Sequence, residues 1–364
     1  MDPATFLCCV EAIKSSDAAG QEDAANQIAG LSDPSMLPQI WHHVSDDSPL
    51  VRRVMLWTLR NYSSQIEYSP LLSCLRDPDM AVREAALLLF MEGGSSSTGA
   101  LVDAVSSTDD ALRFSAVEAL GQFRTPEAVN PLMNAAISDN PDIREVAILS
   151  LGVYADACVV PTLVAALDDE PQIRLAALEG LKTRPLSPAD AEKVSVCVSD
   201  ADPAIRTAAV AVLGKHVPKS CADDESSSVR RTTAAVIASP EILGKLCCDA
   251  DPSVRMAAAE AVGKRKYAME DVLLPLLSDE VPGVRRAAVT GLAFSKRPDV
   301  VPALIRCLSD PKPGVQAAAA TALGEIGGDE VIAALSASSQ SGNAILRGII
   351  KNALSAAMKK SSPE

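Results

Sequence analysis

The sequence predicts an all-α protein, folded as a right-handed α-α superhelix of about eleven stacked helical hairpins. A motif centred on an Arg recurs at intervals of 24 to 32 residues, and such a period is typical of solenoid arrays. Each copy also contains two apolar segments with helical spacing, separated by a short acidic turn. The register positions are Arg52, Arg83, Arg113, Arg144, Arg174, Arg206, Arg230, Arg255, Arg285, Gln316 and Arg347.

The second helix of each hairpin, called helix B, has clear start signals. A short polar residue stands four positions before the Arg, where its side chain can accept hydrogen bonds from the free N–H groups of the first turn. Proline follows at the next position in most copies, where a missing N–H does no harm. The predicted caps are Ser48, Asp79, Asp109, Asn140, Asp202, Ser226, Asp251 and Asn343, whereas Glu170, Val281 and Lys312 depart from the pattern.

Helix B also has one apolar face and a predicted end. Counted from the Arg, small or apolar residues fill positions −1, +2, +3, +6 and +7, and at about 100° per residue these form a single stripe. One hairpin cannot bury this stripe alone, so neighbouring hairpins must stack. Glycine at position +8 is predicted to end the helix as a C-cap in Gly121, Gly152, Gly214, Gly263 and Gly324.

The pattern Asp-x-x-Pro-x-Val-Arg-x-Ala-Ala-x-x-x-Leu-Gly resembles HEAT repeats, specifically the short type also found in phycobilisome lyase subunits. The resemblance covers about residues 34–356. Because Asp and Arg tend to form ladders between adjacent repeats in that family, it implies a structural role for the Arg series and for the acids at the matching position. These acids are Asp46, Asp77, Asp168, Asp200, Asp224, Asp249, Asp279 and Asp310; Ser107, Ser138 and Ser341 replace the Asp, and Gln316 breaks the ladder.

The repeats divide the chain into five predicted segments. These are N-terminal capping helices (1–33), a first subarray (34–214), an irregular truncated repeat (215–228), a second subarray (229–358) and a disordered tail (359–364). In the truncated repeat, helix A has room for little more than one turn, from Pro218 to Ala222. The contraction indicates either a bend between two subarrays or a deletion absorbed by small repacking. Within the first subarray, residues 93–99 (Gly-Gly-Ser-Ser-Ser-Thr-Gly) are predicted to be a flexible connecting loop.

Composition limits the possible partners and the location of the protein. A formal net charge of −14 argues against binding a nucleic-acid backbone over a long surface. No apolar run is long enough for a transmembrane helix, and the N-terminus lacks the features of a signal peptide. The nine Cys residues have neither metal-site nor disulfide spacing, which favours buried thiols in a reducing compartment. We therefore expect a cytoplasmic protein with no membrane contact.

The residues that usually carry catalysis are scarce. Only three His are present and none is followed by Glu, which excludes a di-metal enzyme of the kind that deoxyhypusine hydroxylase represents. The adjacent His42 and His43 point about 100° apart on a helix and are poor joint ligands. A metal or nucleophile site around His216, near Cys221, Asp223 and Asp224, lacks a third component at a suitable spacing. We predict no catalytic, metal-binding or cofactor-binding residue.

Positions +1 and +5 of helix B point away from the stacked core, and the resemblance implies that helix B lines a concave face. Large apolar residues at such positions are notable in a chain with only 3% aromatic residues. The predicted protein-binding residues are Arg53, Trp57, Glu84, Leu88, Phe114, Glu118, Glu145, Leu149, Leu175 and Glu179. Beyond the truncated repeat, the corresponding positions become smaller and more basic, with Arg231, Met256, Glu260, Arg286 and Thr290.

Charge follows the same division. Residues 1–150 contain 21 acidic and 9 basic residues, whereas residues 210–300 contain 12 and 13. We therefore expect the predicted groove to bind an amphipathic, partly basic segment of a partner protein, with Trp57 and Phe114 as anchors. The alternative is that these side chains pack within the superhelix and that the acids only maintain solubility.

Two functions from different classes follow from these observations. The first is a non-enzymatic scaffold or adaptor that binds another protein. The alternative, implied by the resemblance to the short repeat type, is a chromophore (phycobilin) lyase-like subunit. That activity would need a concave pocket able to hold a linear tetrapyrrole, together with a partner subunit, and repeats of this kind serve many unrelated tasks.

Overall fold

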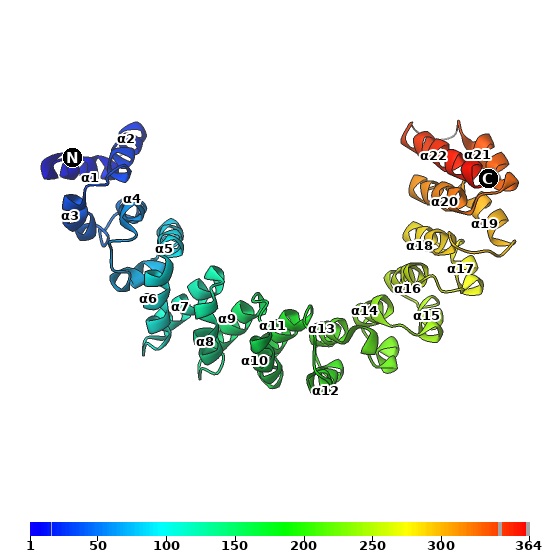
Figure 1. The fold of residues 1–364 in the computed structure, drawn as a ribbon, viewed down its shortest axis with the longest axis horizontal. Coiled ribbons are helices and arrows are strands. Elements are labelled where there is room, and N and C mark those ends of the chain that lie inside the picture. Colours follow the sequence, from blue (N-terminus) through cyan, green and yellow to red (C-terminus); the bar gives the residue numbers. More distant parts are fainter. Residues whose placement is uncertain (16, 341–343, 362–364) are drawn as a thin grey trace. The chain divides into compact units, whose positions relative to one another are not determined.

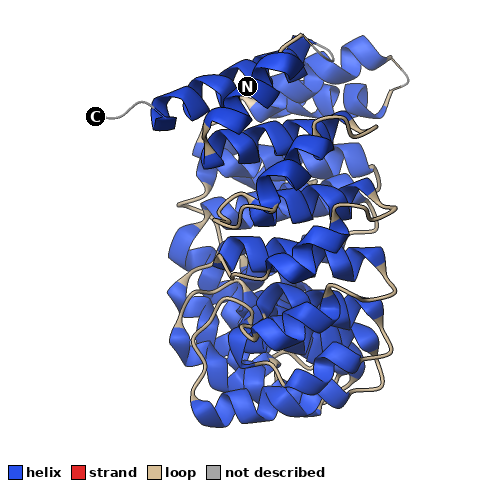
Figure 2. Cartoon of the chain, turned by 90° about the vertical axis from the view of Figure 1, so that its right-hand side faces the viewer, coloured by secondary structure: helices blue, strands red, loops and turns tan. Residues whose placement is uncertain are grey.

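A computed structural model describes residues 1–15, 17–340 and 344–361. These residues form helices joined by short turns, with no strand among them (Figures 1 and 2), so the predicted all-α class is confirmed. The chain divides into two compact units, unit 1 (Met1–Pro185) and unit 2 (Leu186–Glu364). The division falls in Arg184-Pro-Leu-Ser-Pro188, where two prolines interrupt the helical pattern.

Unit 1 consists of hairpins whose two helices form two layers, with the A helices on one side and the B helices on the other (Figure 1). Neighbouring B helices contact one another, as α4 and α5, α7 and α9, and α9 and α11 do. The A positions hold α1 (Pro3–Lys14), α3 (Leu37–His42), the 3₁₀ helix η3 (Ser69–Arg76), α6 (Gly94–Val105), α8 (Pro126–Ala135) and α10 (Val160–Ala165). The B positions hold α2 (Ala18–Ala29), α4 (Pro49–Leu59), α5 (Met80–Glu92), α7 (Asp110–Phe123), α9 (Pro141–Gly152) and α11 (Pro171–Leu181).

Unit 2 repeats the same arrangement. Its B helices α13, α14, α16, α18, α20 and α22 contact one another in sequence. The A positions hold α12 (Pro188–Val196), η8 (Lys219–Asp223), α15 (Pro240–Leu246), α17 (Glu270–Leu276), α19 (Val300–Cys307) and α21 (Asp329–Ser338). The B positions hold α13 (Pro203–Leu213), α14 (Ser227–Val236), α16 (Pro252–Arg265), α18 (Pro282–Leu292), α20 (Pro313–Ile326) and α22 (Ala344–Ser361).

Most of the predicted caps make the expected hydrogen bonds. The side chains of Asp79, Asp109, Asn140, Asp202 and Asp251 accept from backbone N–H groups of the first turn. Ser48 and Ser226 have the extended backbone of a cap but make no such bond. Glu170, Val281 and Lys312 make none either, as their departure from the pattern predicts. Asn343 lies outside the described residues.

Six of the register Arg residues join two successive repeats through an Asp of the next turn. The Arg52 guanidinium donates through Nε and Nη2 to the two carboxylate oxygens of Asp77, at 2.7 Å each, and through Nη1 to the carbonyls of Asp46 and Asp47 in its own turn. The carboxylate also accepts from the backbone N–H of Asp79, which fixes the next turn. The same geometry recurs in Arg144–Asp169, Arg206–Asp224, Arg230–Asp249, Arg255–Asp279 and Arg285–Asp310.

The ladder differs from the prediction at one turn. Arg144 binds Asp169 rather than Asp168. In this turn the paired Asp stands five positions before the next register residue, Arg174, whereas in the other bridges it stands six positions before. Arg83 keeps only the bonds to its own turn carbonyls, and Arg113 pairs with Asp110 of its own helix, since Ser107 and Ser138 replace the Asp. Gln316 likewise reaches only the carbonyl of Asp310, and Ser341 lies outside the described residues.

The truncated repeat of residues 215–228 keeps the ladder intact. Helix A is reduced to the 3₁₀ helix η8, close to the predicted single turn from Pro218 to Ala222. The bridges Arg206–Asp224 and Arg230–Asp249 span only 18 and 19 residues, against 25 for Arg285–Asp310. The residues missing from this repeat therefore shorten helix A, whereas the turn and helix B keep their positions relative to the ladder. A bend at this position stays a prediction.

Three of the five glycines at position +8 do not end their helices, which corrects the prediction. Helices α7, α16 and α20 continue past these glycines to Phe123, Arg265 and Ile326. Gly152 is the last residue of α9, but it lacks the positive φ of a C-cap glycine. These glycines instead let neighbouring B helices touch. A Cβ added to Gly263 would lie 2.8 Å from Cα of Gly291 on the next B helix. Only Gly214, with a φ of 55°, follows the end of its helix as predicted.

Residues 93–99 also differ from the prediction. Gly94 opens helix α6, so the predicted flexible loop is the first part of a helix. The Ser97 hydroxyl donates to the carbonyls of Phe90 and Gly94, and the Thr98 hydroxyl donates to the carbonyl of Gly94. Gly, Ser and Thr have low helix propensity. These hydrogen bonds, together with packing against neighbouring helices, therefore stabilise the start of α6.

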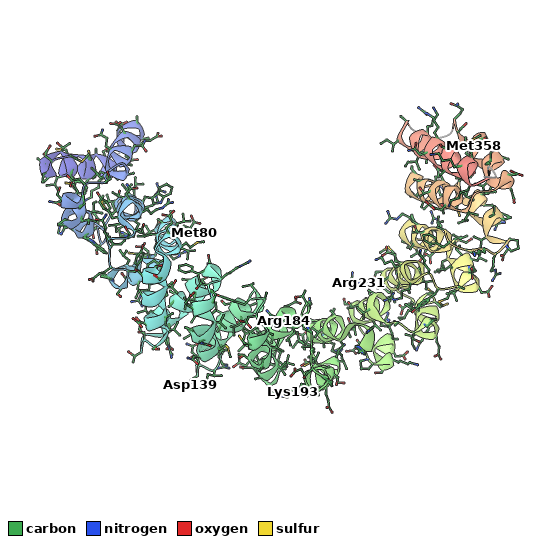
Figure 3. The ribbon with its side chains drawn as sticks, viewed as in Figure 1. Met80, Asp139, Arg184, Lys193, Arg231 and Met358 are labelled. Carbon is green, nitrogen blue, oxygen red and sulfur yellow. The ribbon has the colours of Figure 1, made fainter. Side chains whose placement is uncertain are left out.

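The C-terminal ends of the B helices are joined by a second set of bonds. The Arg184 guanidinium (Figure 3) donates to the carbonyls of Gly152 and Asp156, both at 3.1 Å, at the end of the preceding repeat. Tyr154 reaches the carbonyl of Leu120 in the same way. Lys360 binds Glu325. Helix α22 includes residues 359–361 of the predicted disordered tail, which corrects that part of the prediction. Residues 362–364 lie outside the described part. These donors satisfy carbonyls that a helix end leaves free.

Removing one buried carboxylate of the ladder should destabilise unit 2. We expect Asp310→Asn to lower the free energy of unfolding by about 3 kcal/mol, because it leaves the Arg285 guanidinium buried without its counter-charge. Asp271→Asn, which breaks the exposed Asp271–Arg297 pair, should cost less than about 1 kcal/mol. Urea unfolding, with hydrogen exchange of the α18 and α20 amides, measures both. Equal effects of the two substitutions would contradict this role of the ladder.

The ladder should also make the protein sensitive to acid. Hydrogen bonds and ion pairing with arginine lower the pKa of Asp169, Asp249 and Asp310, and those of Asp77, Asp224 and Asp279 are lowered too, against the cost of burial. A carboxylate whose pKa is lower in the folded than in the unfolded state stabilises the fold at pH values above the unfolded pKa. This stabilisation is lost as the pH falls through the folded pKa. Unfolding midpoints should stay level from about pH 7 to 5 and fall below that. A level midpoint down to about pH 3 would contradict this expectation.

The close contact of glycines predicts an unusual response to alanine. Gly263→Ala should destabilise the protein by about 1–3 kcal/mol, because the added methyl group meets the backbone of α18. Gly348→Ala is the matched control: Gly348 also lies in a B helix, but a Cβ there meets nothing within 4 Å. It should stabilise the helix by up to about 1 kcal/mol. Thermal unfolding compares the two, and stabilisation by both would show that the helices have room at Gly263.

Candidate functional site

The ten predicted binding residues all lie on B helices of unit 1, and none is buried. The apolar members are well exposed for their size, with Trp57 at 48%, Leu149 at 50%, Leu88 at 42% and Phe114 at 37%. Arg53, Glu145 and Leu175 are half-buried. We call this set the B face: Arg53, Trp57, Glu84, Leu88, Phe114, Glu118, Glu145, Leu149, Leu175 and Glu179.

Two grooves run between neighbouring B helices on this face. Arg53 and Trp57 line a groove of about 460 Å³ between α2 and α4, together with Leu50 and Val54. Glu84 and Glu118 line a smaller groove of about 260 Å³ between α5 and α7. The structure therefore brings four of the ten residues together in two grooves. The remaining six are exposed or half-buried on the helix surfaces.

The ring of Trp57 is held by neighbouring charges. The guanidinium carbon of Arg60 lies 5.6 Å from the ring centroid, within the range of a cation–π contact. Arg60 in turn pairs with Glu92 at the end of α5. The pKa of the Glu92 carboxyl is lowered by this pairing. The Arg60 guanidinium thus covers part of one face of the indole, and about half of Trp57 stays open to solvent, at 48% exposure.

The B face carries unneutralised negative charge. Glu84, Glu118 and Glu145 form no ion pair with any residue that the structure describes, whereas Glu179 pairs with Lys182. The imbalance extends over the whole unit. Residues 1–185 contain 26 acidic and 12 basic residues, and residues 186–364 contain 21 of each, so the formal charge of −14 resides in unit 1.

Sequence reasoning missed several exposed apolar residues on the same helices. Met91 is 50% exposed at the end of α5, and Val153 and Met80 (labelled in Figure 3) are also exposed. Met91 and Val153 follow the register Arg by eight and nine positions, at and just beyond the position where the glycine pattern predicts the end of helix B. Helix α5 continues to Glu92, so Met91 belongs to its exposed surface, whereas Val153 is the C-cap residue that follows α9. Helical periodicity extended by one turn would have found them.

The same positions in unit 2 have a different character. Arg231 and Arg286 are exposed, and Met256, Glu260 and Thr290 are exposed or half-buried. Large apolar side chains are therefore rare on this face. Phe294 is the exposed aromatic of unit 2, and the Lys266 ammonium lies 4.5 Å from its ring centroid.

The residues considered for chemistry are engaged in structural contacts. Asp224 belongs to the ladder and Asp223 pairs with Lys245. Cys221 is buried, and burial raises the pKa of its thiol; burial also raises the pKa of Cys74 to about 11 and that of Cys247 to about 12. Among the described residues, no group of three or more His, Cys, Asp or Glu is placed to hold a metal ion.

One further property concerns membranes. In the described ranges, no single helix is long and apolar enough to cross a bilayer. The pair α5 and α6, bent by 119° at their junction, meets the criterion together by length and composition only.

Comparison with protein families decides the classification. A model of HEAT repeats matches residues 9–91, 98–182 and 269–355, and a model of the single HEAT repeat matches residues 241–264. These matches cover most of the chain. The chain belongs to the HEAT-repeat family. The HEAT models are general ones, and the resemblance to the short phycobilisome-lyase type is not confirmed by them.

Solved structures show the same HEAT solenoid. A chain from a structure of Kap95p with RanGDP matches with a TM-score of 0.60 at 13% identity, and one from the Kap95:Nup1 complex with 0.61 at 13%; each match covers 98% of this chain and 61% of the other. Importin beta matches with a TM-score of 0.56 at 15% identity, over 100% of this chain and 56% of the other. The chain thus spans about three fifths of their length. No curated protein sequence matches.

Proposed function

We propose that this protein is a non-enzymatic scaffold or adaptor that binds a partner protein through the B face of unit 1. The observation that carries the proposal is the groove between α2 and α4, in which Arg53 and Trp57 lie side by side on one wall. Exposed aromatic side chains next to a groove are typical binding hot spots. The likeness in fold to Kap95, whose structures include RanGDP and Nup1, is compatible with a role in protein binding.

The charges of the B face favour a basic, amphipathic segment as its partner. Glu84 and Glu118 flank one groove, which Arg83 also lines, and Glu145 follows on the next helix. None of the three carboxylates forms an ion pair with a described residue. A partner segment with Lys or Arg on one side and apolar residues on the other would match both features. Cytoplasmic location and the lyase-like alternative stay predictions; a coloured product on co-expression with bilin synthesis and an acceptor protein would support the latter.

Loss of the two aromatic anchors should abolish partner capture. Each anchor of this kind contributes about 2 kcal/mol, or a factor of about 30 in affinity, so Trp57→Ala with Phe114→Ala should weaken binding by about 30-fold to about 1000-fold. The measurement is affinity capture of the tagged full chain from its native lysate, at low and moderate salt, with quantitative mass spectrometry. Higher salt should also reduce capture, because opposite charges attract less strongly.

Phe294→Ala is the matched control, since it removes an exposed aromatic side chain from unit 2. It should leave capture unchanged. A protein partner retained equally by the double variant and by this control would place binding outside the B face.

A further inference from the structure

A third groove in unit 1 shares no lining residue with the two grooves of the B face. Its volume is about 540 Å³, and helix α6 forms one side of it. Met91 from α5, Val102 from α6 and Phe123 from α7 give it apolar walls. Exposed apolar side chains around a groove mark interaction sites on soluble proteins. We call it the α6 groove.

The glycines of α6 keep this groove open. A Cβ added to Gly94 or Gly99 would meet nothing within 4 Å, and both glycines line the groove. The helix therefore presents bare backbone where a larger residue would fill the space. The hydroxyl bonds of Ser97 and Thr98 to the carbonyls of Phe90 and Gly94 keep this glycine-containing start helical. The groove is thus built by the sequence of α6 itself.

Polar groups without partners lie among the apolar walls. Asp103 and Glu127 line the groove, and neither forms an ion pair with a described residue. The Thr125 hydroxyl oxygen, also in the lining, is buried and makes no hydrogen bond with any residue that the structure describes. Buried hydroxyls are normally hydrogen-bonded. The carboxylates, which are exposed, would attract a cationic side chain of a ligand.

We propose that the α6 groove binds a short peptide segment of a partner protein, in which an aliphatic or aromatic residue stands beside Lys or Arg. The apolar side chain would enter between Met91, Val102 and Phe123. The basic side chain would pair with Asp103 or Glu127, in keeping with the negative charge of unit 1. This site is separate from the B face and does not depend on its proposed function.

The variant Gly99→Leu tests the site without disturbing the core. The new side chain would project into the open groove, and leucine has the higher helix propensity, so the melting temperature should stay level or rise. The double variant Asp103→Lys with Glu127→Lys reverses the charge at exposed positions and leaves the apolar walls in place. Gly348→Leu is the matched control, because Gly348 is an exposed helical glycine of unit 2 with nothing within 4 Å of an added Cβ.

The probe is a displayed library of random twelve-residue peptides, selected on the full chain. Enriched peptides are then made with a fluorescent label, and their binding is measured by anisotropy. We expect an apolar residue next to Lys or Arg in the enriched set. Gly99→Leu and the charge-reversed variant should each weaken binding at least tenfold, and Gly348→Leu should leave it unchanged.

The pair Trp57→Ala with Phe114→Ala separates this site from the B face, and should not affect these peptides. Peptides that bind equally well to wild type and to Gly99→Leu would overturn the proposal, as would a selection that yields none. Peptides lost only with Trp57 and Phe114 would support the B face and overturn the α6 groove.

Discussion

The paired hydrogen bonds between an Arg of one repeat and an Asp of the next set the register of this protein. Hydrophobic stacking of helices is not directional, and alanine-rich faces could slide along one another. The guanidinium removes that freedom, because its planar donors bind the carbonyls of one turn and the carboxylate of the next at the same time. Arg285, for example, joins Asp310 to the carbonyls of Asp279 and Glu280. Successive turns are thereby held at a fixed offset whatever the length of helix A between them.

Close helix contacts and exposed residues both follow from this register. Once the turns are aligned, position +8 of one B helix meets position +6 of the next, as Gly152 meets Gly180 and Gly263 meets Gly291. Positions +1 and +5 then point away from the contact. Two links of the ladder are missing in unit 1, where Ser107 and Ser138 replace the Asp. The Nε of Arg113 is buried without a hydrogen bond there. The α6 groove and the groove between α5 and α7 lie in these same repeats.

The sequence was sufficient for the features that depend on one repeat alone. The period, the caps such as Asp251, and the exposure of Trp57 and Phe114 follow from local spacing and helical geometry. Features that depend on two repeats were not predictable in the same way. Gly263 has the composition of a C-cap, but its role is decided by Gly291, which is 28 positions later. Residues 94–99 have the composition of a loop, yet contacts with α5 and α7 make them helical. The grooves likewise depend on how far apart neighbouring helices lie, so no pattern within one repeat could locate them.

The distribution of charge bears on why unit 1 differs from unit 2. Each bridge of the ladder uses one acid and one base, so the ladder contributes nothing to the net charge. The excess of acid in unit 1 therefore comes from residues outside it, including Glu84, Glu118 and Asp103. Unpaired like charges repel and lower the stability of a folded unit. Unit 2, with four consecutive bridges and equal numbers of acids and bases, shows that the repeat does not need such an excess to fold. An excess that costs stability, placed beside exposed apolar side chains and open grooves, supports the proposal that unit 1 binds a basic partner.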